Sequence, residues 1–106
     1  MRKYGYLNTA IRVNKKELIY KIMIHETKKE GVFVYLYTSL TAENCSYDCH
    51  YETLEDALEE WQEELDERGW IEIPDPLPYC QHDSFLPVRV KGSDIGKPQV
   101  GQVRET

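Results

Sequence analysis

One amphipathic segment, residues 53–69, constrains the fold more than any other part of this 106-residue chain. Thr53 is a favourable N-cap residue, and Asp56 three positions later gives a start that resembles a capping box. Gly69 suits the left-handed conformation that often ends a helix, so the pattern predicts a helix over residues 54–68. Its apolar side chains recur at helical spacing and form one stripe, namely Leu54, Ala57, Leu58, Trp61 and Leu65.

Four segments before this helix have the alternation, or the β-branched and aromatic content, that is typical of strands. They are residues 4–13, 18–27, 32–39 and 45–51. Lys28-Lys-Glu-Gly31 predicts a tight antiparallel turn between the second and third of them. Asn14-Lys-Lys-Glu17 has the form of a helix start, so a short helix from Asn14 stays an alternative for the second segment.

The C-terminal third is less regular. Residues 70–73 are a candidate short strand, and three prolines between residues 74 and 78 exclude regular structure after it. Residues 85–90 are a last strand candidate. We therefore predict one α+β domain over residues 1–90, followed by a loosely ordered tail over residues 91–106. Its fold class would be an antiparallel sheet of about four strands with one long amphipathic helix packed on one face.

The compartment is predicted from what the sequence lacks. No apolar h-region follows the basic start, and the densest apolar run, Val32–Tyr37, is far shorter than the roughly 20 residues of a membrane helix. The three cysteines are odd in number, which makes a disulfide framework improbable. We expect a cytoplasmic protein with reduced thiols and no membrane association.

Charge is distributed unevenly along the chain. Residues 1–31 carry eight basic and three acidic side chains, whereas residues 32–83 carry one basic and fourteen acidic ones, and the net charge is −6. A net negative chain is a poor match for phosphate, so we expect no nucleic-acid partner. The oligomeric state is not defined by these patterns.

Acidic residues crowd the outer face of the predicted helix. Like charges four residues apart oppose one another, and acids in the last turn oppose the helix dipole. Such departures from local rules sometimes mark a functional surface, here a docking face for a basic protein, although a merely solvated face, or one neutralised by nearby lysines, is the simpler alternative. The candidate partner-binding residues are Glu55, Glu59, Glu60, Glu63, Glu64 and Glu67.

A second candidate site lies in the proline-rich loop. Cys80 and His82 are two residues apart in an extended segment and would face the same side, where Asp83 could orient the imidazole. The chain has no P-loop, Gly-x-Gly loop or serine elbow, and we expect no cofactor. The candidate loop residues are Asp75, Cys80, His82 and Asp83.

Two further groupings favour structure over chemistry. Cys45 and Cys49 on one strand would be about 13 Å apart, too far to share a zinc ion, so we expect no metal site. Phe33, Tyr35 and Tyr37 share a strand face that could stack bases, but no basic residue interleaves them, and packing is the favoured interpretation.

Two stretches resemble known families. Thr53-Leu-Glu-Asp-Ala-Leu-Glu-Glu60 resembles the helix opening of HicB-type antitoxins, which also follows a small antiparallel sheet. In those antitoxins a Pro-Asp-Leu-Pro-Gly-Cys-like loop precedes the helix, whereas Pro74-Asp-Pro-Leu-Pro-Tyr-Cys80 follows it here. Residues 70–91 look like the C-terminal part of a group of small bacterial proteins of unknown function. That resemblance implies a bacterial cytosolic setting and no particular activity.

These observations predict a non-catalytic protein-interaction module, of the inhibitor or immunity type, that uses the acidic helix face. The alternative is a small-molecule-binding domain or enzyme that uses the proline-rich loop.

Overall fold

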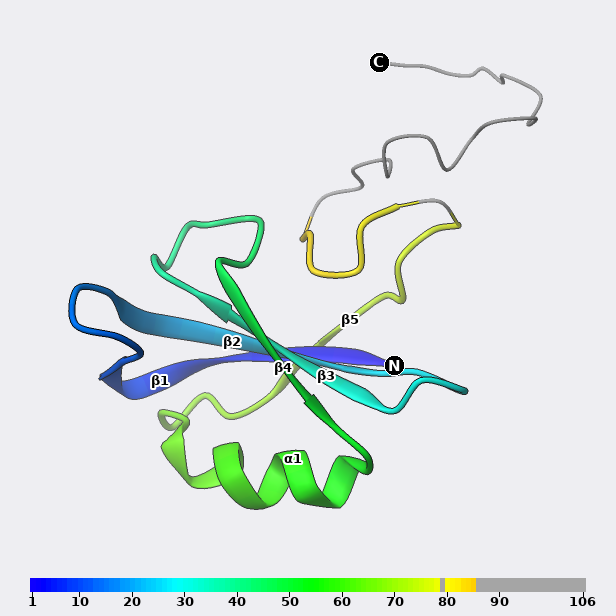
Figure 1. Cartoon of the computed structure of the whole chain (residues 1–106), viewed down its shortest axis with the longest axis horizontal. Helices are drawn as coiled ribbons and strands as arrows, with labels where there is room; N and C mark the ends of the chain where they lie inside the picture. Colours follow the sequence, from blue (N-terminus) through cyan, green and yellow to red (C-terminus); the bar gives the residue numbers. More distant parts are fainter. Residues whose placement is uncertain (79, 86–106) are drawn as a thin grey trace, which may run out of the picture.

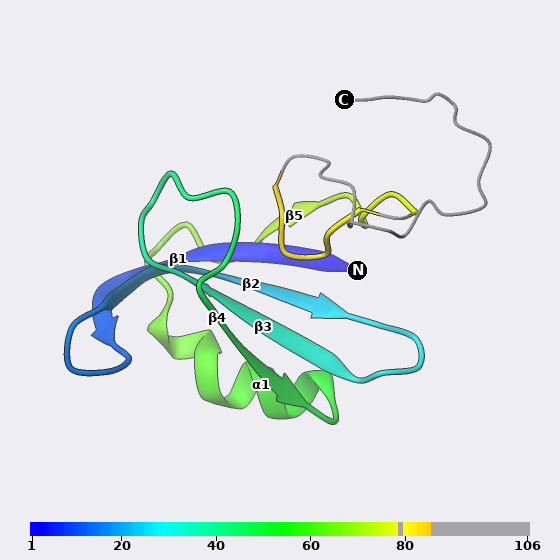
Figure 2. The same ribbon diagram turned by 45° about the horizontal axis from the view of Figure 1, so that its top comes forward.

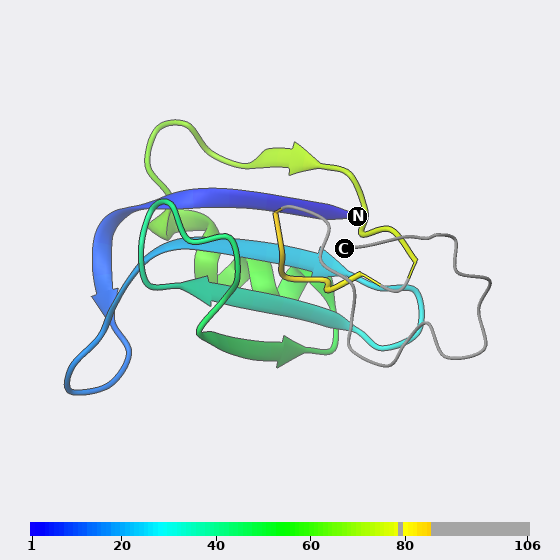
Figure 3. The ribbon, with the colours of Figure 1, turned by 90° about the horizontal axis from the view of Figure 1, so that it is seen from above.

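The computed structural model describes residues 1–78 and 80–85, which form an antiparallel sheet with an α-helix on one face (Figure 1). The five strands lie side by side in the order β4-β3-β2-β1-β5, as the view from above shows (Figure 3). Their bounds are Arg2–Arg12 for β1, Leu18–Glu26 for β2, Val32–Tyr37 for β3, Tyr47–Tyr51 for β4 and Ile71–Ile73 for β5.

The turn between β2 and β3 forms where the sequence predicts it. Gly31 has a φ of 85°, a conformation that glycine adopts without strain. The Thr27 amide donates to the Gly31 carbonyl at 2.9 Å and closes the turn. A Cβ at position 31 would lie 2.7 Å from the Tyr51 carbonyl oxygen of β4, so this glycine also permits close strand approach.

The connection between β1 and β2 is a bend, so the alternative of a helix starting at Asn14 is wrong. The Asn14 Oδ1 accepts hydrogen bonds from the amides of Lys16, at 2.9 Å, and Glu17, at 3.3 Å. Asparagine commonly forms such local bonds and thereby competes with helix. β2 then starts at Leu18 and pairs with β1, with a register shift between Tyr6 and Ile11.

The predicted fold class of about four strands and one long helix is wrong in both respects. The sheet has five strands, because β5 pairs with β1 as an edge strand. The α-helix, α1, covers only Leu54–Trp61 and not residues 54–68, and a single 3₁₀ turn, Gln62–Glu64, follows it. The described residues therefore form mostly antiparallel sheet with one short α-helix.

The helix is short because the chain after it joins the sheet. Leu65 is extended, with φ of −77° and ψ of 152°, and bridges Leu7 of β1. The Asp66 amide donates to the Tyr6 carbonyl at 2.9 Å. Acids near the end of a helix oppose its dipole, and no basic residue lies in the last turn of α1 to offset them.

The apolar stripe of α1 packs on one face of the sheet, where Figure 2 shows the helix running beneath the strands. Ala57 and Trp61 are buried there in a cluster with Ile22, Ile24 and Val34. The Trp61 indole Nε1 donates to the Tyr51 hydroxyl at 2.8 Å, which satisfies the polar atom of a buried ring. Thr53 caps the helix as predicted, and its hydroxyl accepts from the Asp56 amide.

The opposite face of the sheet is covered by the chain after β5. We call residues 74–78 and 80–85 the strap, and Figures 1 and 3 show it crossing above the strands on the side away from α1. Met23, Tyr35 and Tyr37 form a second buried cluster on this face, and Phe85 of the strap packs against it. The sheet is thus covered on both faces.

In the described part of the chain, no helix is long and apolar enough to cross a membrane. The strand candidate over residues 85–90 lies, apart from Phe85, outside the described residues. The predicted domain end at residue 90 and the predicted tail over residues 91–106 lie outside them as well.

Candidate functional site

The six glutamates predicted to bind a partner are all exposed, and we call them the acidic surface. Glu55, Glu59 and Glu60 project from α1, whereas the rest lie beyond it. They do not form the single straight row that a long helix would give, because the α-helical geometry ends at Trp61. The early end of the helix also removes part of the predicted repulsion between carboxylates four residues apart. The members beyond α1 are Glu63, Glu64 and Glu67.

No lysine neutralises the acidic surface by direct contact in the described part of the chain. The ion pairs there link the Met1 amino group to Asp75 at 2.8 Å and Arg68 to Asp66 at 2.6 Å. Glu60 accepts a hydrogen bond from the Tyr51 hydroxyl at 2.8 Å. The acidic surface therefore presents its charge to solvent on α1 and on the segment that follows it, and it is available to a cation that approaches from outside.

The proline-rich loop is held to the sheet by Arg2, which is 6% exposed. Its Nε donates to the Pro74 carbonyl at 2.8 Å, and its Nη1 donates to the carbonyls of His82, at 2.8 Å, and Ser84, at 2.9 Å. One guanidinium thus binds both ends of the strap. Burial lowers the pKa of Arg2, although the neighbouring Asp75 and Asp83 act in the opposite direction.

Asp83, one of the candidate loop residues, has a structural role. Its Oδ2 accepts a hydrogen bond from the Cys45 amide at 2.7 Å, and its carbonyl accepts one from the Tyr37 hydroxyl at 2.5 Å. Burial, and then the Asp83 carboxylate, raise the pKa of the Cys45 thiol to about 12. Burial likewise raises the pKa of Tyr37. The Cys45 thiol and the Tyr37 hydroxyl are therefore neutral near pH 7, and the two hydrogen bonds of Asp83 dock the strap on the sheet.

Cys80 and His82 do not form the predicted thiol–imidazole pair. No hydrogen bond joins them within the described residues, and Cys80 is buried. The His82 ring instead lies edge-on to His25 of β2, with 4.7 Å between ring centroids. The carboxylate that was expected to orient His82 belongs to Asp83, which binds Cys45 instead. The structure therefore does not bring Cys80, His82 and Asp83 together in the arrangement that the sequence predicted.

The sequence assigned two groupings to structure, the cysteines of one strand and the aromatic residues of another. Among the described residues, no set of three histidine, cysteine, aspartate or glutamate side chains could hold a metal ion. Tyr35 and Tyr37 are buried, and Phe33 stacks on Tyr35 with 6.1 Å between centroids. The aromatic face is closed by the strap, so packing, the favoured interpretation of these rings, accounts for them.

Sequence reasoning missed three buried polar residues on the strap face: Arg2, Lys21 and His25. The Lys21 Nζ donates to the carbonyls of Leu40, at 3.1 Å, and Ala42, at 2.8 Å. It also lies 4.1 Å from the centroid of the Phe85 ring, a cation–π contact. The alternation of β2 could have revealed that Lys21 and His25 are buried, because they share a strand face with the apolar Met23.

His25 is the least satisfied of these groups. It is 6% exposed, and its Nδ1 is buried without a hydrogen-bond partner among the described residues. Burial lowers the pKa of His25 to about 4, with further contributions from His82, the terminal amino group and Arg2. The imidazole is therefore neutral near pH 7.

These observations define a small α+β protein whose described residues form a five-stranded antiparallel sheet. A short acidic helix covers one face of the sheet, and the strap, held by Arg2, covers the other. No family model, curated protein or solved structure matches the chain. Its function has to be argued from its own residues.

Proposed function

We propose that this chain is a cytoplasmic, non-catalytic protein-interaction module, of the inhibitor or immunity type, whose acidic surface binds a basic protein partner. The observation that carries the proposal is the exposure of all six glutamates without a lysine or arginine partner in the described chain. Electrostatic complementarity of this kind steers association and suppresses wrong partners.

The scaffold supports this role because the acidic surface is anchored by a buried core. Ala57 and Trp61 fix α1 on the sheet, and the Tyr51 hydroxyl ties Glu60 to Trp61. A charged face held in one geometry loses less conformational entropy on binding than a mobile acidic tail would.

Catalysis at the strap has less support. Asp83 binds the Cys45 amide, and Cys80 is buried, so the candidate loop residues act in docking the strap. Asp75 pairs with the terminal amino group, which lowers the pKa of its carboxyl. We therefore propose no enzymatic role for Asp75, Cys80, His82 and Asp83.

The experiment is a pull-down with the whole protein as bait, followed by affinity measurement on the partner that it retains. The test variant is Glu59→Lys/Glu63→Lys, and the matched control is Glu43→Lys/Asp48→Lys. All four residues are exposed, and both variants change the net charge equally, but Asp48 lies on β4 and Glu43 in the loop before it. The proposal expects the test variant to lose at least about tenfold in affinity and the control to bind like wild type.

Ionic strength provides a second readout. Binding by exposed charges weakens as salt rises, so the affinity of wild type should fall between low and physiological salt, and the remaining affinity of the test variant should fall less. Equal binding by wild type and both variants would refute the acidic surface as the docking site.

A further inference from the structure

Arg2 is a buried cation that forms no ion pair with the described residues. Its five N–H groups have three acceptors there, the carbonyls of Pro74, His82 and Ser84. These bonds use Nε and Nη1, so the two N–H groups of Nη2 have no acceptor among the described residues. Buried charges in proteins are normally paired, whereas the carboxylates of Asp75 and Asp83 act on this guanidinium electrostatically without forming an ion pair with it.

A hollow of about 310 Å³ lies beside this guanidinium, at the start of the strap. Arg2 is the one cation in its described lining. Asp75 is the one acid there, and the Met1 amino group already binds it at 2.8 Å. The volume lies at the lower end of the range for small-molecule sites. The apolar wall consists of Ile73, Pro74, Pro76, Leu77 and Phe85.

We propose that this hollow binds a small monocarboxylate with an apolar body. The carboxylate accepts hydrogen bonds from Nη2 of Arg2, and the aliphatic or aromatic body packs against the prolines and Leu77. An acid of this kind gives Arg2 a direct ion-pair partner and buries apolar surface at the same time.

The lining favours a carboxylate over a phosphate. A carboxylate brings one charge and two oxygens, one of which can accept from Nη2. A phosphate would place more oxygens against the apolar walls, where Gln81 and Ser84 are the polar side chains of the described lining besides Arg2 and Asp75. The prolines contribute no amide donors to satisfy them. Leu77 is 58% exposed at the rim, so it can close over an apolar chain without first breaking a packed contact.

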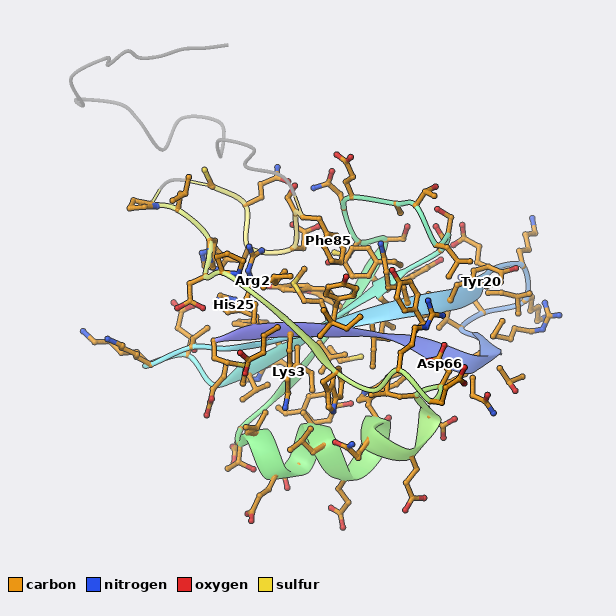
Figure 4. The ribbon with its side chains drawn as sticks, turned by 180° about the vertical axis from the view of Figure 1, so that it is seen from behind. Arg2, Lys3, Tyr20, His25, Asp66 and Phe85 are labelled. Atoms are coloured by element: carbon orange, nitrogen blue, oxygen red, sulfur yellow. The ribbon has the colours of Figure 1, made fainter. Side chains whose placement is uncertain are left out.

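The site is independent of the acidic surface. Figure 4 shows Arg2 and His25 between the sheet and the strap, with α1 on the other side of the sheet. The carboxylate site can therefore exist whether or not the acidic surface binds a protein, and the two proposals are tested separately.

The test is an NMR titration of the whole protein with sodium hexanoate, and with hexanamide as the neutral probe of the same shape. Hexanoate should give saturable shifts, and should bind at least about tenfold more tightly than hexanamide, because a charge-assisted hydrogen bond is lost in the amide. Equal affinity for the two probes, or no saturable shift with hexanoate, would overturn the proposal.

Two leucine variants locate the site without disturbing the anchor. Leu77→Asp places a carboxylate and removes an apolar contact at the rim, whereas Leu40→Asp makes the same change at a similarly exposed leucine, 54% against 58%, that does not line the hollow. Hexanoate affinity should fall at least about tenfold in Leu77→Asp and stay unchanged in Leu40→Asp. Equal affinity of the two variants would also overturn the proposal.

Discussion

Acid should weaken this fold through His25, a single buried imidazole. Its pKa is about 4 in the folded protein, whereas an unfolded histidine titrates near 6.5. As the pH falls below 6.5, the unfolded chain takes up the proton before the folded one does. The free energy of unfolding is therefore undiminished above that pH and decreases as the pH approaches 4. The full difference corresponds to about 3 kcal/mol, and the part lost between pH 7 and pH 4.5 to about 2 kcal/mol.

The groups that face His25 support this sign. Its neighbours His82, the terminal amino group and Arg2 disfavour imidazolium electrostatically, whereas Asp75 favours it. The pKa of Asp75 is itself lowered by the amino terminus, so its protonation falls below this pH window. The part of the drop between pH 7 and pH 4.5 that His25→Phe removes can therefore be assigned to His25.

Urea unfolding followed by circular dichroism, at pH 7 and pH 4.5, measures the effect. The perturbation is His25→Phe, which keeps a ring next to Phe33 and gives up an Nδ1 that has no hydrogen-bond partner. Wild type should lose about 2 kcal/mol more of its free energy of unfolding than the variant between the two pH values. His82→Gln should keep most of the loss, because burial is the larger cause of the shift. An equal loss in wild type and His25→Phe would refute the reasoning.

Two further predictions concern the sheet and the thiols. Gly31→Ala should lower the free energy of unfolding by about 1–2 kcal/mol more than Gly69→Ala. Both glycines have positive φ, but only a Cβ at position 31 would meet the Tyr51 carbonyl. Equal urea midpoints and m-values for the two variants would contradict this. Cys45, with a thiol pKa of about 12, should react with a disulfide reagent at pH 8 on the order of a thousandfold more slowly than a free thiol. Fast labelling of the wild type that disappears in Cys45→Ser would contradict this prediction.

Local patterns predicted the parts of the fold that depend on neighbouring residues. The alternation of residues 45–51 anticipated β4, the Lys28–Gly31 segment anticipated the turn before β3, and Thr53 anticipated the start of α1. Each of these signals involves contacts within a few positions. The exposure of the six glutamates also followed from the sequence, because charged side chains rarely lie buried without a partner.

The candidate loop site could not be predicted correctly from the sequence. Two-residue spacing placed Cys80 and His82 on one side of an extended segment, but their partners come from distant strands. His82 meets His25, and Asp83 meets the Cys45 amide. The sequence alone does not show whether the Asp83 carboxylate binds the His82 ring or the Cys45 amide.

By itself, therefore, the sequence determined the starts of β2, β3 and α1 and the exposure of the six glutamates, because these depend on periodicity, capping and turn chemistry. Only the tertiary structure decided that α1 ends at Trp61, since Leu65 and Asp66 gain sheet contacts with Leu7 and Tyr6. It also decided that Arg2 is buried, because carbonyls some 70–80 positions away replace the water that a charged side chain near the amino terminus would otherwise keep.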